Sequence, residues 1–296
     1  MGIGQQSETL GYFREHAEDW RKKANAQDLL RVNVIQQRNG FVLHVIKSRV
    51  ETRSALDVGS GTGDLVCAIA RLGISATGID FADEMIRLGR QQAEQNRLVQ
   101  ADFHCGSIFD FDLTTKRYDL ISANGFIEYI TPAQLEQFLD LAQRALKPGG
   151  SLVLGSRNRL FNMVSINAFT LEELTAGAAD LLLREAVALA GGASLDELAE
   201  SDTVRLQDTE TTHPYTGVGV STRFQYTPVQ LMKLVIASGL CVEQIYPVHI
   251  HGVPPAFKQQ QPEVHVAIAN RLQEFALDGI SLVPYASTFM LHARKE

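Results

Sequence analysis

The chain has 296 residues, of which 45% are apolar and 21% charged, so it can bury one large core. The formal net charge of −7 disfavours nucleic acid as a partner, because phosphate binding needs a basic surface. The N-terminal residues lack the apolar stretch of a signal peptide, and no apolar run is long enough to span a bilayer. Three well-separated cysteines, with Cys67 and Cys241 expected in the core, fit reduced thiols. We therefore expect a cytoplasmic protein without a membrane span or a nucleic-acid partner.

The first half of the chain alternates strand and helix patterns after a helical start. Residues 8–24 and 28–48 predict two amphipathic helices, which form an N-terminal helical cap over 1–50. The core over 51–157 then has predicted strands at 54–58, 75–79, 101–105, 118–122 and 151–156. The helices between them are predicted near 63–72, 83–96 and 132–146. This spacing is typical of βαβ units and predicts a parallel sheet.

The rhythm breaks after Arg157, and residues 158–225 predict an insertion. A helical pattern runs from Thr170 to Ala190, and a polar, Thr-rich stretch follows from Ser201 to Thr222. A connection of this length is unusual, so we expect a helical lid over the substrate site. The helix rich in Leu and Ala would equally suit a homodimer face or core packing.

The α/β core resumes over 226–296. A helix after Thr227, a strand at 241–247, a helix at 262–277 and a strand at 286–294 are predicted there. Four capping boxes predict helix starts, at Thr131/Gln134, Thr170/Glu173, Ser194/Glu197 and Thr227/Gln230.

A glycine-rich motif between the first predicted strand and helix points to a ligand. It reads Leu-Asp-Val-Gly-Ser-Gly-Thr-Gly over 56–63, and such glycines let the backbone turn sharply beside a ligand. A dinucleotide fingerprint that begins at Gly59 would need a third glycine where Asp64 stands. Asp57 would also repel a diphosphate, whereas it suits the ammonium and sulfonium groups of S-adenosylmethionine (SAM).

The ends of the next strands supply further candidates for an adenosine site. Asp80 ends the second strand and can accept both ribose hydroxyls, although a plain helix N-cap is the alternative. Phe81 and Met85 can pack on adenine, Ser107 can bond its amine and Ile108 can cover its face.

These motifs, together with Tyr-Asp-Leu-Ile-Ser-Ala-Asn-Gly-Phe-Ile-Glu-Tyr-Ile from 118 and Leu-Lys-Pro-Gly-Gly from 146, resemble class I SAM-dependent methyltransferases. The resemblance is strongest to the ubiquinone-biosynthesis O-methyltransferase type and covers roughly 10–158 and, more weakly, 223–294. It implies a Rossmann-like, doubly wound α/β fold with seven strands, the last antiparallel. It also implies that SAM binds and that S-adenosylhomocysteine is the product.

The resemblance assigns SAM contacts residue by residue. They are Asp57, Gly59, Asp80, Phe81, Ser107, Ile108 and Asn124, and we add Gly61 and Met85 from the motif reading. An aromatic residue and an arginine that often hold the methionine end correspond to Tyr12 and Arg38, which could instead serve the core and a surface ion pair. Two positions depart from the family pattern: Ser107 replaces an acidic residue, and Tyr129 replaces a histidine after Glu128.

Histidines elsewhere are the candidates for a general base, since their pKa lies near working pH. His213 falls in the expected lid, and His249 and His251 follow the sixth predicted strand, near the edge where such sheets bind ligands. The His-x-His pair has no third ligand apparent in the sequence, so we predict no metal.

The predicted function is methyl transfer from SAM to a hydroxyl of a small-molecule acceptor. The sulfonium is a good leaving group, so the protein supplies mainly proximity and orientation. N-methylation is the alternative within the class. A nicotinamide-dependent oxidoreductase and a non-catalytic SAM-binding module are the alternatives outside it.

Overall fold

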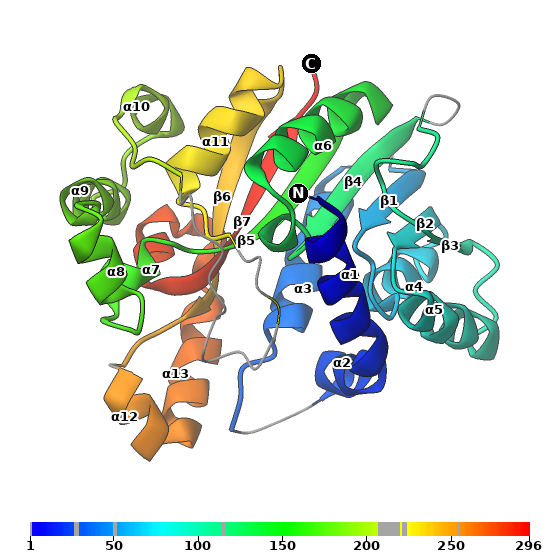
Figure 1. The fold of residues 1–296 in the computed structure, drawn as a ribbon, viewed down its shortest axis with the longest axis horizontal. Coiled ribbons are helices and arrows are strands. Elements are labelled where there is room, and N and C mark those ends of the chain that lie inside the picture. The colour runs from blue at the N-terminus through cyan, green and yellow to red at the C-terminus, as the bar shows by residue number, and fades with distance from the viewer. Residues whose placement is uncertain are drawn as a thin grey trace.

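The computed structural model describes residues 2–26, 30–49, 52–113, 117–206, 220, 224–253 and 255–296. A seven-stranded sheet in the order β3-β2-β1-β4-β5-β7-β6 forms its centre (Figure 1). The strands are β1 (Ser54–Val58), β2 (Ser75–Asp80), β3 (Ala101–Cys105), β4 (Tyr118–Asn124), β5 (Leu146–Arg157), β6 (Cys241–Ile250) and β7 (Ala286–Arg294). β7 is antiparallel to both neighbours, and the pairs among β1 to β5 are parallel. The predicted Rossmann-like α/β sheet is confirmed.

Two hydrophobic clusters cover the two faces of the sheet. Helices α6 (Pro132–Ala145), α9 (Ala179–Ala190) and α11 (Pro228–Ala237) contribute to one cluster. Helices α3 (Val34–Ser48), α4 (Asp64–Ala70) and α5 (Asp83–Gln95) contribute to the other. Successive residues of β5 alternate between them, because side chains of a strand point to opposite faces. Leu152 and Leu154 join the first cluster and Val153 the second.

The N-terminal helices differ in their bounds from the prediction. The first is interrupted at His16, which separates α1 (Gly2–Glu15) from α2 (Ala17–Asn25). The second, α3, begins at Val34, where the Asn33 side chain caps it by accepting a hydrogen bond from the Gln36 N–H. Both α1 and α2 lie in front of the sheet in Figure 1, on the side toward α5.

The predicted helix from Thr170 to Ala190 is two helices, α8 (Thr170–Thr175) and α9, because Gly177 takes a left-handed φ of 68° between them. The capping box predicted at Thr170 is wrong. Thr170 donates to the Asn162 carbonyl and Glu173 pairs with Arg159, so neither caps the helix. The other three capping boxes are confirmed, at α6, α10 (Leu195–Glu200) and α11.

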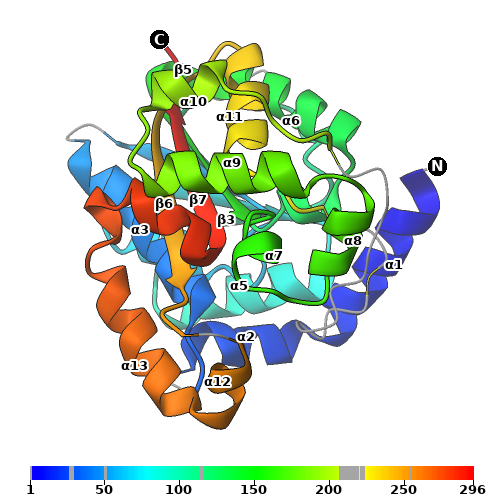
Figure 2. The same cartoon turned by 90° about the vertical axis from the view of Figure 1, so that its left-hand side faces the viewer.

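The described part of the 158–225 segment is a group of helices packed against the core. It begins with α7 (Phe161–Val164), and Figure 2 shows α7, α8, α9 and α10 together on the side toward the viewer. Leu182 and Leu189 of α9 are fully buried in the first cluster. The buried Glu185 carboxylate accepts from the Thr227 hydroxyl and the Val229 N–H, which ties α9 to α11. Most of the Thr-rich stretch expected to close as a lid lies outside the described residues.

Two helices follow β6, namely α12 (Pro255–Gln260) and α13 (Pro262–Gln273). α13 is shorter than predicted and is followed by 3₁₀ turns at Ala276–Asp278 and Ile280–Tyr285. Cys67 is buried as expected, but Cys241 is exposed, because the first residue of β6 turns its side chain outward. No helix within the described ranges combines the length and the apolar character needed to cross a membrane.

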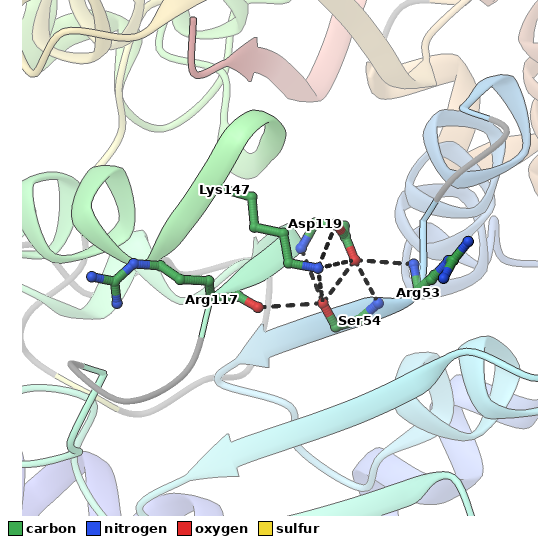
Figure 3. Close-up of polar contacts among 5 residues, drawn as sticks. All are labelled: Arg53, Ser54, Arg117, Asp119 and Lys147. Atoms are coloured by element: carbon green, nitrogen blue, oxygen red, sulfur yellow. Dashed lines mark hydrogen bonds and ion pairs between the residues drawn. The ribbon is translucent and has the colours of Figure 1, made fainter.

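One carboxylate joins three strands of the sheet at the end where β1 begins (Figure 3). Asp119 of β4 accepts hydrogen bonds from the backbone N–H groups of Arg53 and Ser54 and from the Ser54 hydroxyl, at 2.8 to 3.0 Å. The Lys147 ammonium of β5 lies 2.8 Å from its Oδ1. Burial raises the pKa of Asp119, but these partners outweigh burial and lower it below the usual value.

We predict that Asp119→Ala lowers the free energy of unfolding by about 1–3 kcal/mol, because it leaves several hydrogen-bond donors without an acceptor. Chemical denaturation at pH 7 measures the effect, with Asp196→Ala on exposed α10 as the control. A carboxylate whose pKa is lowered in the folded state stabilises the protein at pH values above its unfolded-state pKa. This stabilisation is lost as the pH falls through the folded-state pKa. The difference between wild type and variant should therefore shrink on acidification, and an equal loss in the control would contradict this account.

Candidate active site

The glycine loop between β1 and α4 is held against β2. The N–H groups of Gly59 and Ser60 donate to the Ile79 carbonyl at 2.8 and 3.0 Å. Gly59 and Gly63 have φ of 69° and 79°, in the left-handed region that favours glycine. A Cβ at Gly63 would lie 2.5 Å from the Phe103 ring, whereas one at Gly61 would meet nothing within 4 Å. The loop is therefore tightly packed at Gly63, against Phe103, and has open space beside Gly61.

Two buried carboxylates flank this loop. Asp57 accepts a hydrogen bond from the Ser122 hydroxyl at 2.7 Å, and Asp80 accepts from the N–H groups of Gly61 and Ala82 at 2.9 Å each. Burial raises the pKa of Asp57 to about 7, with the Asp80 charge adding to the effect, and raises that of Asp80 to about 6. Ala82, not Asp80, is the N-cap of α5, so Asp80 holds the glycine loop rather than capping the helix. Within the described part of the chain, neither carboxylate forms an ion pair with a cationic side chain.

The loop and both carboxylates open into a cavity of about 880 Å³. Nearly all the residues predicted for the site line it, from elements far apart in sequence. They are Arg38, Asp57, Gly59, Gly61, Asp80, Phe81, Met85, Ser107, Ile108, Asn124, His249 and His251. Tyr12 is not among the lining residues, and His213 lies outside the described part of the chain. The strand ends thus converge on one site, as a doubly wound sheet predicts.

Several buried polar atoms of the cavity wall have no partner within the described structure. Among them are Trp20 Nε1, Arg38 Nε, Ser60 Oγ and Asn124 Oδ1. A buried donor or acceptor without a partner costs free energy, so native sites normally satisfy it with water or ligand. The wall therefore offers two donors, an acceptor and a hydroxyl to a polar molecule.

The aromatic contribution of the N-terminal helices differs from the prediction. Phe13 and Trp20 line the cavity, with ring centroids 5.9 Å apart, whereas the Tyr12 ring stacks on His16 at 4.2 Å. Thr9, which also lines the cavity, precedes Phe13 by four residues, and Trp20 follows it by seven. A spacing of four places Thr9 and Phe13 on one face of α1, so the helical period was the signal that singles out Phe13 over Tyr12.

A buried ion cluster beside Gly125 was missed in the sequence. Glu128 accepts from Arg38 Nη2 at 3.0 Å and from Arg157 Nε at 3.1 Å, and its own side chain is 2% exposed. The Arg38 side chain is 14% exposed, so its ion pair is not a surface contact. Glu128 thereby fixes two guanidinium groups on the cavity wall. A carboxylate in a segment that follows a buried strand was the available signal.

Three imidazoles meet at the other end of the cavity. His249 and His251 come from the end of β6, and His265 from α13 brings its Nε2 to 3.1 Å from that of His249. Burial lowers the pKa of His251 to about 3 and that of His265 to about 4, and it also lowers the pKa of His249 well below the usual value. The expectation that no third imidazole accompanies the His-x-His pair is wrong, because helix α13 returns to the strand end.

The comparisons with known proteins agree with this geometry. Residues 55–150, from β1 into β5, match the family model described as a methyltransferase domain. The ubiquinone biosynthesis O-methyltransferase of Coxiella burnetii (strain RSA 493 / Nine Mile phase I) is 28% identical over 156 residues, which are 52% of this chain and 63% of that protein. The corresponding enzyme of Hydrogenovibrio crunogenus is 28% identical over 56% of this chain and 66% of its own length. The chain thus spans slightly less than two thirds of these curated relatives.

Solved structures share the fold over nearly the whole chain. The magnesium protoporphyrin IX methyltransferase of Synechocystis PCC 6803, solved with bound SAH, superposes with a TM-score of 0.58 and 10% identity over 99% of this chain and all of its own. The CcbJ methyltransferase of Streptomyces caelestis gives a TM-score of 0.55 and 14% identity over 92% of this chain and all of its own. Sheet, glycine loop and acidic strand ends define a class I methyltransferase fold. Residues 55–150 match a methyltransferase domain, and the sequence relatives and structural neighbours of the chain are methyltransferases, so the chain is similar to the class I SAM-dependent methyltransferases.

We predict that Asp57→Asn stabilises the ligand-free protein at pH 8 by about 1–3 kcal/mol, because it removes a buried charge without a cation. A raised pKa in the folded state gives stability that is present at low pH and is lost as pH rises through that pKa, here about 7. The variant's advantage should therefore shrink as the pH falls and disappear only near the ordinary pKa of 3.8. Thermal unfolding across this range measures it, and a variant less stable than wild type at pH 8 would contradict the prediction.

Proposed function

We propose that the protein transfers the methyl group of SAM to a hydroxyl of a small-molecule acceptor and releases S-adenosylhomocysteine. The observation that carries this proposal is the pair of buried carboxylates, Asp57 and Asp80, on either side of the glycine loop. SAM brings an ammonium and a sulfonium, which offset buried negative charge, and two ribose hydroxyls, which need acceptors. A dinucleotide would instead bring its diphosphate to Asp57.

The residues along the cavity fit the parts of SAM in order. Asp80 Oδ1 and Oδ2 each accept one backbone N–H and retain lone pairs for ribose hydroxyls. Met85 and Ile108 are buried apolar side chains suited to adenine. Arg38, whose Nε has no partner in the described structure, and Asn124 suit the carboxylate and ammonium of the methionine end. When bound, SAM supplies an electrophilic methyl group with a neutral leaving group.

The remaining cavity suits the acceptor. Phe161 and Asn162 of α7, the histidine pair on β6 and Lys258 of α12 line it beyond the cofactor residues. These residues offer an aromatic wall beside polar and cationic groups, which favours an aromatic or apolar acceptor with a hydroxyl or acidic substituent. Oxygen as the nucleophile is supported by the names of the sequence relatives, which are O-methyltransferases. The chain's own contribution is to orient the acceptor and exclude water.

Ligand binding tests the cofactor half of the proposal. We predict that SAM and S-adenosylhomocysteine give saturable heats in titration calorimetry, and that NADH gives none. Asp80→Asn should weaken SAM binding by about 1–3 kcal/mol, because a charge-assisted acceptor of ribose hydroxyls is lost. Asp102→Asn on exposed β3 serves as the matched control. Binding of NADH without SAM would end the proposal.

Turnover tests the acceptor half. With radiolabelled SAM and a panel of aromatic and aliphatic hydroxyl compounds, we expect methyl transfer to at least one member. His251→Asn should lower kcat/KM by about 10²-fold or more, because it removes a group at the reacting end. SAM affinity should stay within a few-fold, since none of the predicted cofactor contacts is touched. Transfer only to amines would contradict the proposal that the acceptor is a hydroxyl. Unchanged turnover in the variant would contradict a role for His251 in the reaction.

A further inference from the structure

The three-histidine cluster (His249, His251 and His265) has a geometry for which the predicted cofactor contacts give no reason. One nitrogen from each ring lies within 4.8 Å of the others. The ring centroids are 4.2 Å apart for His249 and His251 and 4.8 Å apart for His251 and His265. Two of these rings line the acceptor half of the cavity. The cluster thus faces the space where the acceptor would lie.

We propose that His249, His251 and His265 bind one divalent transition-metal ion, such as Zn²⁺ or Co²⁺, with a coordination position open to the acceptor cavity. Zinc–imidazole bonds of about 2.0–2.1 Å at tetrahedral angles place ligand nitrogens about 3.3 Å apart. The Nε2 atoms of His249 and His265 lie at 3.1 Å, close to that spacing. Three protein ligands with a fourth position open are typical of catalytic rather than structural zinc.

Unsatisfied ring nitrogens distinguish a metal site from an ordinary histidine pair. A hydrogen bond between His249 and His265 explains their 3.1 Å contact alone. It leaves both nitrogens of His251 and the Nδ1 of His265 buried without a partner in the described structure. A metal ion would satisfy His251. His249 Nδ1 lies 3.1 Å from the Ser287 hydroxyl, the kind of outer contact that orients a metal-bound imidazole.

The backbone at His249 is also strained and firmly held. Its φ of 56° lies in the left-handed region, which non-glycine residues rarely adopt. Its N–H donates to the side-chain oxygens of Gln37 and Gln273, at 2.9 and 3.2 Å. Strain of this kind persists where surrounding structure fixes it, and it is common at ligand sites. The conformation turns the His249 ring toward His265 rather than leaving it in the regular alternation of β6.

Charge around the cluster indicates what would fill the open position. No Asp or Glu joins the three imidazoles among the described residues, and the Lys258 and Arg157 charges act on His249. A bound ion would keep its full charge beside two cations, so an anionic oxygen ligand is favoured. The role of the open position rests on the proposed function. The acceptor's O–H bond would break, its proton would leave to solvent and its oxygen would bond to the metal. That oxygen then forms the C–O bond as the C–S bond of SAM breaks.

Metal titration of the 296-residue chain tests the site independently of turnover. After chelator treatment and dialysis, we expect one equivalent of Co²⁺ to give the visible absorption of a four- or five-coordinate complex. Zn²⁺ should displace it and Mg²⁺ should not, because Mg²⁺ prefers oxygen ligands. His265→Asn should weaken Co²⁺ affinity at least about tenfold, since even outer-shell changes cost 10–100-fold. His104→Asn, a half-exposed histidine on β3, should leave affinity unchanged.

Two results would overturn the metal site. One is the absence of a Co²⁺ spectrum in protein that still binds SAM with saturable heat, which shows that the fold is intact. The other is equal Co²⁺ binding by wild type, His265→Asn and a second variant, His251→Gln. A failure to bind SAM would instead count against the proposed function, because none of the predicted cofactor contacts is a histidine.

Discussion

The site depends on two buried carboxylates that have no cationic partner among the residues the structure describes. Asp57 and Asp80 stand at the ends of neighbouring parallel strands, where burial opposes ionisation and each charge disfavours the other. Only neutral donors hold them: the Ser122 hydroxyl for Asp57, and the Gly61 and Ala82 N–H groups for Asp80. A cation entering the cavity relieves this cost, whereas a diphosphate increases it. We therefore expect the ligand-free protein to be less stable at neutral pH than it would be with neutral side chains at these two positions. We also expect this cost of burying charge to favour the binding of a positively charged cofactor.

The rest of the fold brings partners for such a cofactor to the same edge of the sheet. Between β1 and β4 the strand order reverses, which opens the crevice that a doubly wound sheet offers to ligands. Phe13 and Trp20 close one side, and the ion cluster centred on Glu128 sets two guanidinium groups on another. At the opposite end of β1, the Asp119 carboxylate of β4 binds donors at the start of β1 and on β5. Stability and binding thus depend on opposite ends of the same strands.

Local patterns in the sequence were sufficient for the sheet and the cofactor motifs but not for the contacts that depend on chain return. All seven strands were predicted, because short apolar runs bounded by turn residues are local signals, and strands such as β1 and β2 are buried along nearly their whole length. The acidic strand ends were found because a charge beside a glycine loop is rare in a merely structural turn. His265 was missed because only the packing of α13 against β6 brings it close to His249. Phe13 was missed because it and its neighbour Tyr12 are both aromatic and differ only in the helix face from which they project. Gly177 interrupts the helix predicted from Thr170 to Ala190. A glycine is a local signal for such a break, but the leucine pattern favoured one continuous helix.

The number of protons released when SAM binds tests the central claim most directly. Near pH 6.5 both carboxylates are partly protonated in the free protein, since their pKa values are about 7 and 6. Binding of a cation should lower these pKa values and release protons, which calorimetry in two buffers of different ionisation enthalpy measures. We predict net release near pH 6.5 that vanishes by pH 9 and is reduced in Asp57→Asn. SAM binding with no proton release at any pH, identical in wild type and variant, would contradict the account.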